Sequence, residues 1–351
     1  MVERHAVILV FGQILSRKWV IFQDSFKDYP KIYLEEWTSS DIKPFVQDKL
    51  GRNELFKKLV GQELQYSELI KEIVNKASGV FVWIELVVRS LIEGSNNGDR
   101  ISDFRRKVQG LPSDLHEFMM QILRNLEKDY LSQAAVMFKV ALHNTPLFLM
   151  TLSFIDEEDP NFPLDVDDRG ISEDEIQERI DTAQRRLNSR CKGLLESFPV
   201  RRRARVRHPN SFFIHTVDFM HRTAQEFLKT EDAQKILQPH LRNAPNPNVC
   251  LLRAFIAEIK SFPVSTSSGQ VSLSELFVLV ENSLYYASEA EISTGLPQTV
   301  LLDEMDRIMS LHQQRLFVDT KGSWTNRYIG VTGKHNSFFI FAIDSVVDGP
   351  D

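Results

Sequence analysis

Apolar residues recur at helical spacing through most of this chain, and that periodicity limits its possible folds more than any other feature. Between residues 66 and 93 they stand at i, i+3, i+4 and i+7, which predicts one long amphipathic helix. The same spacing recurs at 115–126, 131–142, 172–194, 249–259, 273–287 and 301–311. We therefore predict a mainly α fold in which each helix buries one face.

Three apolar stretches are instead typical of strands. Residues 6–11 and 19–22 form runs too short for helices, which indicates one or two buried strands at the edge of an α/β sheet. Residues 211–219 follow the helix predicted at 172–194, which opens with the capping-box pair Ser172 and Glu175. A long helix followed by a small β-hairpin is typical of a winged helix. Turn-forming sequences then divide the chain into a sheet segment (1–37), a helical domain (38–110), a winged-helix domain (111–242) and a C-terminal helical domain of unknown function (249–351).

Composition excludes several classes of protein. A net charge of −6 gives no overall attraction to nucleic acid or to an anionic membrane. Two cysteines, Cys191 and Cys250, are too few for a disulfide framework or a four-cysteine zinc site, so we expect both in the core. The most hydrophobic window, 80–88, contains Glu85 and is shorter than the roughly 20 apolar residues of a membrane span. We expect a reduced, cytoplasmic protein without a membrane segment.

Catalytic and metal-binding motifs are missing from these residues. The sequence contains no G-x-x-x-x-G-K-[ST], H-E-x-x-H, G-x-S-x-G or G-x-G-x-x-G. The closest group of histidines, His208, His215 and His221, does not have the spacing of a known metal site. We therefore expect no catalytic residue, no metal ion and no enzymatic activity.

A cluster of arginines, with strand signals on both sides of it and the clearest at 211–219, is the strongest local charge. This basic run consists of Arg201, Arg202, Arg203, Arg205 and Arg207. One interpretation is a cationic wing that contacts the phosphates of nucleic acid or another anionic partner. The other, which we favour, is a solvated turn facing the acidic loop at 156–168 of the same domain.

Four stretches carry motifs of a known family. They are 14–26, with Ser-Arg-Lys-Trp at 16–19; 33–50; 76–91 together with 111–115; and 190–196 together with 219–228, which reads Phe-Met-His-Arg-Thr-Ala-Gln-Glu-Phe-Leu. Together they resemble the downstream half of fungal NACHT proteins, members of the STAND class of signal-transducing NTPases. The resemblance implies that 1–37 is a remnant of the α/β nucleotide-binding core and that 249–351 is the helical domain that follows NACHT in many of these proteins.

The resemblance also implies roles for three residues. Arg17 matches the family's sensor arginine for the γ-phosphate, Gly79 lies where the helical domain approaches the adenine, and His221 matches the histidine that contacts the β-phosphate of ADP. The family's phosphate-binding loop and acidic metal-binding strand precede the position of Ser16, and the residues before Ser16 leave no room for them. We therefore expect these contacts to be vestigial, with ADP or ATP bound only in an intact relative.

The expected function is that of a non-catalytic regulatory and protein-interaction fragment of a NACHT-type signalling protein. Its partners would be intact NACHT relatives or a second copy of the chain. The alternative is a winged-helix protein that binds nucleic acid through the basic run at 201–207, which the acidic overall charge disfavours.

Overall fold

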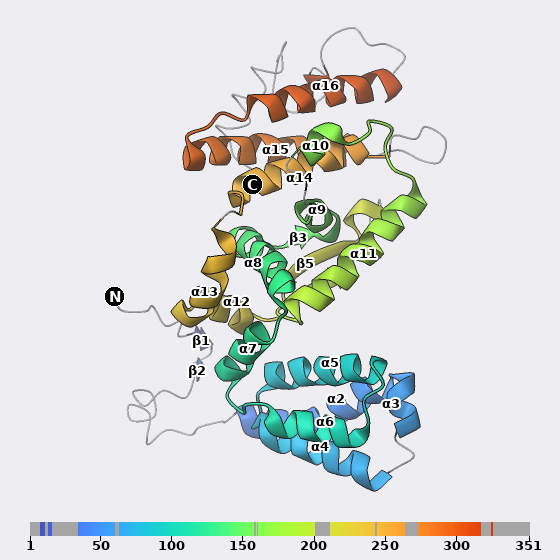
Figure 1. Ribbon diagram of the computed structural model, residues 1–351, viewed down its shortest axis with the longest axis vertical. Coiled ribbons are helices and arrows are strands. Elements are labelled where there is room, and N and C mark those ends of the chain that lie inside the picture. Colours follow the sequence, from blue (N-terminus) through green and yellow to red (C-terminus); the bar gives the residue numbers. More distant parts are fainter. Residues whose placement is uncertain are drawn as a thin grey trace. The chain divides into compact units, whose positions relative to one another are not determined.

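The computed structural model describes residues 8–10, 13–15, 34–59, 63–157, 159, 161–200, 211–242, 244–263, 273–316 and 324–325 (Figure 1). The described residues are mainly helical with a small antiparallel sheet, which confirms the predicted mainly α fold. The chain divides into two compact units. The first combines Met1–Ile84 with Gly94–Gln109, and the second combines Glu85–Glu93 with Gly110–Asp351.

Helices dominate the first unit. They are α2 (Leu34–Gly51), α3 (Glu54–Leu59), α4 (Glu63–Ala77), the two ends of α5 (Phe81–Asn96) and α6 (Ile101–Gly110). Their apolar faces meet in a core that includes Ile42, Leu69, Trp83 and Phe104, each wholly buried. Because α2 begins at Leu34, helix starts inside the segment that we assigned to a sheet, 1–37.

The expected sheet remnant is represented in the described residues by two short strands. β1 (Ile8–Val10) pairs with β2 (Gln13–Leu15) in an antiparallel hairpin. β1 lies inside the run predicted at 6–11, whereas β2 was not predicted. The strand predicted at 19–22 lies outside the described residues.

The single helix predicted over 66–93 is wrong. The chain leaves helical geometry after Ala77, because Ser78 and Gly79 have φ angles of 48° and 83°. Residues with positive φ end a helix, and Val80 N donates to Ala77 O at 2.8 Å across this turn. The next helix starts where Ile84 N donates to Val80 O at 3.3 Å. The apolar pattern did not reveal this break because the residues on both sides keep the same helical spacing. Helix α6 was also missed.

The second unit contains a three-stranded antiparallel sheet with helices around it. In chain order it has α7 (Leu115–Arg124), α8 (Lys128–His143), β3 (Leu147–Phe148), α9 (Leu149–Ile155), α10 (Phe162–Asp165), α11 (Glu173–Cys191), β4 (Leu195–Pro199), η1 (Ser211–Phe213) and β5 (His215–Phe219). The strand order is β3-β5-β4. In chain order a helix (α8), a short strand (β3) and three helices (α9, α10 and α11) precede the paired strands β4 and β5, and β3 lies beside β5 (Figure 1). A long helix followed by a pair of strands is the order that we predicted for a winged helix, and the winged-helix assignment itself stays a prediction. Two details differ from prediction: β3 was not expected, and 211–219 opens with the 3-10 turn η1 before the strand starts at His215.

Helices after the sheet complete this unit. They are α12 (Arg222–Leu228), α13 (Glu231–Leu237), the 3-10 turn η2 (Gln238–Leu241), α14 (Pro247–Ser261), α15 (Leu273–Thr294) and α16 (Thr299–Leu316). Helix α14 is buried along most of its length, and it packs against α8, α9 and α10 as well as α15 and α16. One apolar cluster joins Val140 and Leu147 to the residues of α14–α16. The described parts of 111–242 and 249–351 therefore belong to the same compact unit.

One expectation from composition is supported directly. Cys191 and Cys250 are both buried and both free of disulfides, as predicted, and burial raises the pKa of each thiol. Within the described part of the chain, no helix combines the length and the apolar character that crossing a membrane requires.

Candidate functional site

Most of the residues singled out from the sequence lie outside the described residues. These are Arg17, Arg201, Arg202, Arg203, Arg205 and Arg207. Their surroundings are therefore not part of the site described below. Gly79 and His221 are described, and they belong to different compact units.

Gly79 lies in the turn between α4 and α5 of the first unit. Its φ of 83° is in the left-handed region, which glycine adopts without the strain that a side chain would bring. The preceding residue, Ser78, also has positive φ, at 48°. A glycine at this position thus has a structural reason, independent of its predicted approach to an adenine ring.

His221 is the second residue after the end of β5, and it caps α12. Its Nδ1 accepts a hydrogen bond from Thr223 N at 3.1 Å and lies 2.9 Å from Thr223 Oγ1. Because Nδ1 accepts, the proton of the neutral ring is on Nε2. The side chain is exposed. The ring is therefore oriented by the cap, with its Nε2–H free of this local interaction.

The strand pairing places residues on either side of the segment that contains the basic run. Pro199 of β4 is paired with His215 of β5, and Val200 N donates to Ile214 O at 2.9 Å. Residues 201–210, which contain the basic run, follow Val200 in the sequence and lie outside the described residues, so their position at a wing stays a prediction.

Cations just upstream of the wing are engaged within the protein. In α11, Arg186 forms an ion pair with Asp156 at 2.7 Å, and Arg179 forms one with Glu157 at 2.6 Å. Arg190 contacts Gln133 and lies 5.0 Å from the ring of Tyr130. The acidic loop at 156–168 thus pairs with arginines of α11. The same pairing for the basic run itself stays a prediction.

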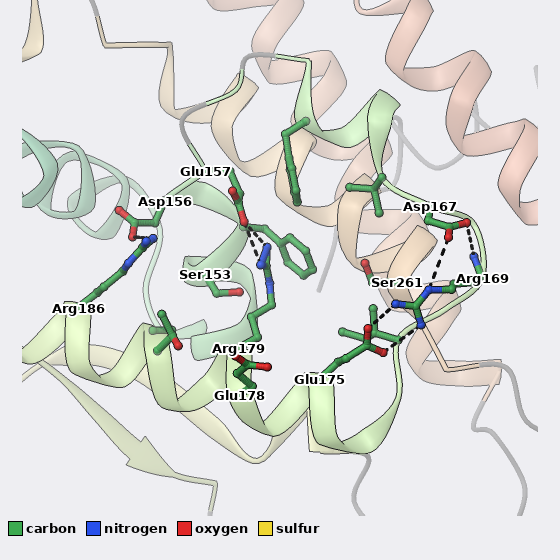
Figure 2. A pocket seen from close by; sticks show the side chains of 16 residues that line it. Ser153, Asp156, Glu157, Asp167, Arg169, Glu175, Glu178, Arg179, Arg186 and Ser261 are labelled. Carbon is green, nitrogen blue, oxygen red and sulfur yellow. Dashed lines mark hydrogen bonds and ion pairs between the residues drawn. The ribbon is translucent and has the colours of Figure 1, made fainter.

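These ion pairs surround a cavity of about 470 Å³ that the sequence reasoning did not identify (Figure 2). It lies between α9, the acidic loop, the segment that follows α10 and one face of α11. Its lining comprises Ser153, Phe154, Asp156, Glu157, Phe162, Val166, Asp167, Arg169, Ile171, Glu175, Glu178, Arg179, Thr182, Ala183, Arg186 and Ser261. The sequence does contain acids in the loop at 156–168 and arginines on α11, but only the fold shows that these two segments line the same space.

Arg179 projects into the middle of this cavity (Figure 2). Its guanidinium lies 4.0 Å from the ring centroid of Phe154 and 5.6 Å from that of Phe162, within the range of cation–π attraction. Both of its terminal nitrogens donate to the same atom, Oε1 of Glu157, at 2.9 and 2.6 Å. Its Nε is buried and has no hydrogen-bond partner.

A second ion-pair group closes the end of the cavity near the start of α11. Arg169 donates to Glu175 and also pairs with Asp167 at 3.5 Å. Glu175 accepts from the backbone of Ser172 at 2.8 Å as well. The hydrogen bonds from Arg169 and Ser172 lower the pKa of Glu175 to about 2, so this carboxylate is ionised at neutral pH.

A buried carboxyl group acts on Arg179 from the protein interior. Glu258 of α14 is wholly buried, and burial raises its pKa to about 8. The groups that oppose this rise are Thr151 of α9 and the charge of Arg179. Neither oxygen of Glu258 has a hydrogen-bond partner of good geometry. Arg179 thus interacts electrostatically with two carboxyl groups, Glu157 and Glu258.

The described residues contain no group of three or more His, Cys, Asp or Glu side chains arranged to hold a metal ion. Four of the five acids that line the cavity, Asp156, Glu157, Asp167 and Glu175, are paired with arginines.

Comparison with known proteins gives one similarity. A family model described as a domain of unknown function (DUF7791) matches residues 125–270. That stretch runs from just before α8 to beyond α14, so it includes the three-stranded sheet, α11 and the cavity. No match was found among curated proteins or among solved structures.

Proposed function

We propose that this chain is a regulatory, protein-interaction part of a NACHT-type signalling protein and does not itself hydrolyse nucleotide. The observation that carries the proposal is the position of His221 within the winged-helix arrangement. The motif at 219–228 begins at the end of β5, and its histidine caps the next helix with Nε2 directed away from the cap. A histidine held in this way can contact a neighbouring domain through its Nε2–H, and such a contact needs no catalytic group beside it.

The charges of α11 support protein recognition over nucleic-acid binding. In a helix-turn-helix the second helix enters the DNA groove near its N-terminal end. Here that end carries Glu173, Asp174 and Glu175, which would meet the phosphates with like charge. Arg179 and Arg186 of the same helix are already paired with acids. The surface therefore suits a protein partner better than a phosphate backbone.

In this proposal, association of the chain with its protein partner is the output of a regulatory switch. In such switches, two packings of the same domains differ by a small free energy that a ligand or partner biases. The chain would contribute the helical unit and the winged helix, and an intact NACHT relative or a second copy would complete the switch. No G-x-x-x-x-G-K-[ST] sequence occurs in these residues, which supports a non-catalytic role for them.

The proposal is tested by two measurements on the full chain. Sedimentation velocity over a wide range of protein concentration, alone and with a nucleotide-binding NACHT protein, should detect self-association or complex formation. Thermal unfolding with ADP and Mg²⁺ should leave the melting temperature unchanged. A monomer that binds no NACHT protein would contradict the interaction role, and an ADP-dependent rise in melting temperature that His221→Ala removes would contradict the absence of nucleotide binding.

Nucleic-acid binding through the wing is the second candidate, favoured by the position of the basic run between the paired ends of β4 and β5. Its test is fluorescence anisotropy with duplex DNA at several salt concentrations. A binder would lose affinity steeply as salt rises, and replacing Arg201, Arg202 and Arg203 with Gln would reduce the salt dependence. We expect neither effect.

A further inference from the structure

The cavity beside α11 has more negative than positive groups, and two of its acceptors are open. Five carboxylates line it against three guanidiniums. Glu178 is exposed at the cavity and forms no ion pair in the described structure. Both hydrogen bonds from Arg179 use Oε1 of Glu157, so Oε2 of that residue is not used by Arg179. The site therefore has acceptors for an additional cation.

The apolar part of the lining suits a flat cation. Phe154 and Phe162 lie with ring centroids 5.7 Å apart, and a guanidinium of the protein already lies against them. A guanidinium group can stack on aromatic rings while its edge donates to carboxylates, whereas an ammonium ion is a strongly hydrated point charge. Arg179 contacts these rings and Glu157, and the cavity would offer contacts of the same kind to a second guanidinium.

Arg179 also has a second partner available. Its Nε and both oxygens of Glu258 are buried without hydrogen bonds. Unpaired buried polar groups are rare in folded proteins and call for an explanation. Among the described residues, the groups that act on the charge of Glu258 are Arg179 from α11 and Thr151 from α9. An arginine displaced from Glu157 would therefore still face a carboxyl group inside the protein.

We propose that this cavity binds the guanidinium group of an arginine side chain in a partner peptide, held by Glu157 and Glu178, while Arg179 transfers its pairing from Glu157 to Glu258. This goes beyond the regulatory role proposed above, because it assigns a site and a ligand chemistry. Glu258 can form an ion pair with Arg179 only when its carboxyl group is ionised. Since its pKa is about 8, the group is mostly protonated at pH 7 and would release its proton to the buffer on binding.

The test is isothermal titration calorimetry, which measures the affinity of the full chain for acetyl-Gly-Arg-Gly-amide at neutral pH. The matched probe is the same peptide with citrulline, which keeps the shape of arginine and lacks its charge. We expect the citrulline peptide to bind at least about tenfold more weakly, because charge-assisted hydrogen bonds are about twice as strong as neutral ones. Free L-arginine distinguishes a peptide site from a small-molecule site, and we expect it to bind more weakly than the peptide.

Variants separate the site from general charge effects. Glu178→Gln and Glu157→Gln should each weaken the arginine peptide about tenfold. Glu178 is exposed, so its replacement leaves the fold intact even where Glu157→Gln disturbs it. Glu291→Gln removes an equal charge at an exposed position outside the cavity and should change nothing.

The proton balance supplies an independent readout. Titration in two buffers with different ionisation enthalpies should show proton release for the wild type, and none for Glu258→Gln. Equal binding of the arginine and citrulline peptides, tighter binding of free L-arginine than of the peptide, the absence of binding, or an unchanged affinity in Glu178→Gln would overturn the proposal. Proton release that persists in Glu258→Gln would overturn the exchange of partners by Arg179.

Discussion

Glu258 is the residue whose environment departs most from what its side chain prefers. A carboxyl with no exposed surface keeps its proton at neutral pH, because the protein interior solvates its charge poorly and Arg179 compensates only in part. Glu258 stands on α14, which packs against α9 of the same unit, and Arg179 of α11 acts on its charge. Such a group makes the stability of the second unit depend on pH.

We predict that stability falls as pH rises from about 5 to about 8 and that Glu258→Gln weakens this trend. The folded-state pKa of about 8 lies above the ordinary value of 4.5, so between these values the folded protein holds a proton that the unfolded chain has lost. Relative to wild type, the variant should gain a few kcal/mol on going from pH 5 to pH 8. Urea unfolding at both pH values measures this. Glu291→Gln is the control, and parallel pH profiles for wild type and Glu258→Gln would show the expectation to be wrong.

Gly79 is a second residue whose identity follows from local geometry. We predict that Gly79→Ala destabilises the protein by about 1 kcal/mol, because alanine is strained at a φ of 83°. Gly51→Ala is the matched control, since Gly51 is helical and an added Cβ meets nothing within 4 Å. Urea unfolding of the first unit distinguishes the two. A loss of equal size in both variants would mean that backbone conformation is not the cause.

At the scale of elements, α11 is the helix whose sequence was most informative. The predicted capping box is present: Ser172 Oγ accepts from Glu175 N at 3.3 Å, and the Glu175 side chain accepts from Ser172 N at 2.8 Å. The apolar face, from Ile176 to Cys191, is buried as its spacing predicts. Lys192, in the left-handed conformation at φ 47°, ends the helix.

We predict that Ser172→Ala destabilises the second unit by about 1 kcal/mol, because it removes the oxygen that satisfies a free N–H of the first turn. The pairing of Glu175 with Arg169 lowers the pKa of the carboxyl to about 2, so its contribution is present above pH 4.5 and is lost as pH falls toward 2. Chemical unfolding at neutral and acidic pH measures both effects. Ser189→Ala, on the same helix away from the cap, should cost much less; an equal cost would rule out capping as the reason.

Other elements were not predictable from periodicity. The break between α4 and α5 depends on two residues with positive φ, and the apolar spacing continues across it. Strand β3 is two residues long and exists because it pairs with β5, at Leu147 with Val217 and Phe148 with Thr216. A pairing between residues about seventy positions apart leaves no local signal in a segment that short.

At the scale of the whole second unit, an ion-pair network connects the acidic loop to α14 and α16. Lys260 has only 1% of its side chain exposed, and it donates to Leu164 O at 2.9 Å and to Glu304 at 2.5 Å. Arg307 holds both oxygens of Asp168 at 2.8 Å. These partners lower the pKa of Asp168 and of Glu304, so the network is complete above the ordinary carboxyl pKa and weakens as pH falls.

We predict that Glu304→Gln destabilises the protein by about 3 kcal/mol, because the buried charge of Lys260 then keeps as its carboxylate partner the more distant Asp168, at 3.6 Å. Unfolding in urea at neutral pH measures the loss. Glu291→Gln again serves as the control for removal of one negative charge. If both variants unfold at the same denaturant concentration, the network does not stabilise the unit.

The sequence by itself determined the helical character of the chain, the cap and buried face of α11, the burial of both cysteines and the position of a hairpin after the long helix. These features depend on residues close together in the chain, where periodicity and capping act. Only the tertiary structure decided that α14 joins the segments before and after 243–248 into one body, that Glu258 is buried, and that the acidic loop and α11 enclose a cavity. Each of these depends on which distant side chains meet, because burial and ion pairing are set by packing and not by local spacing.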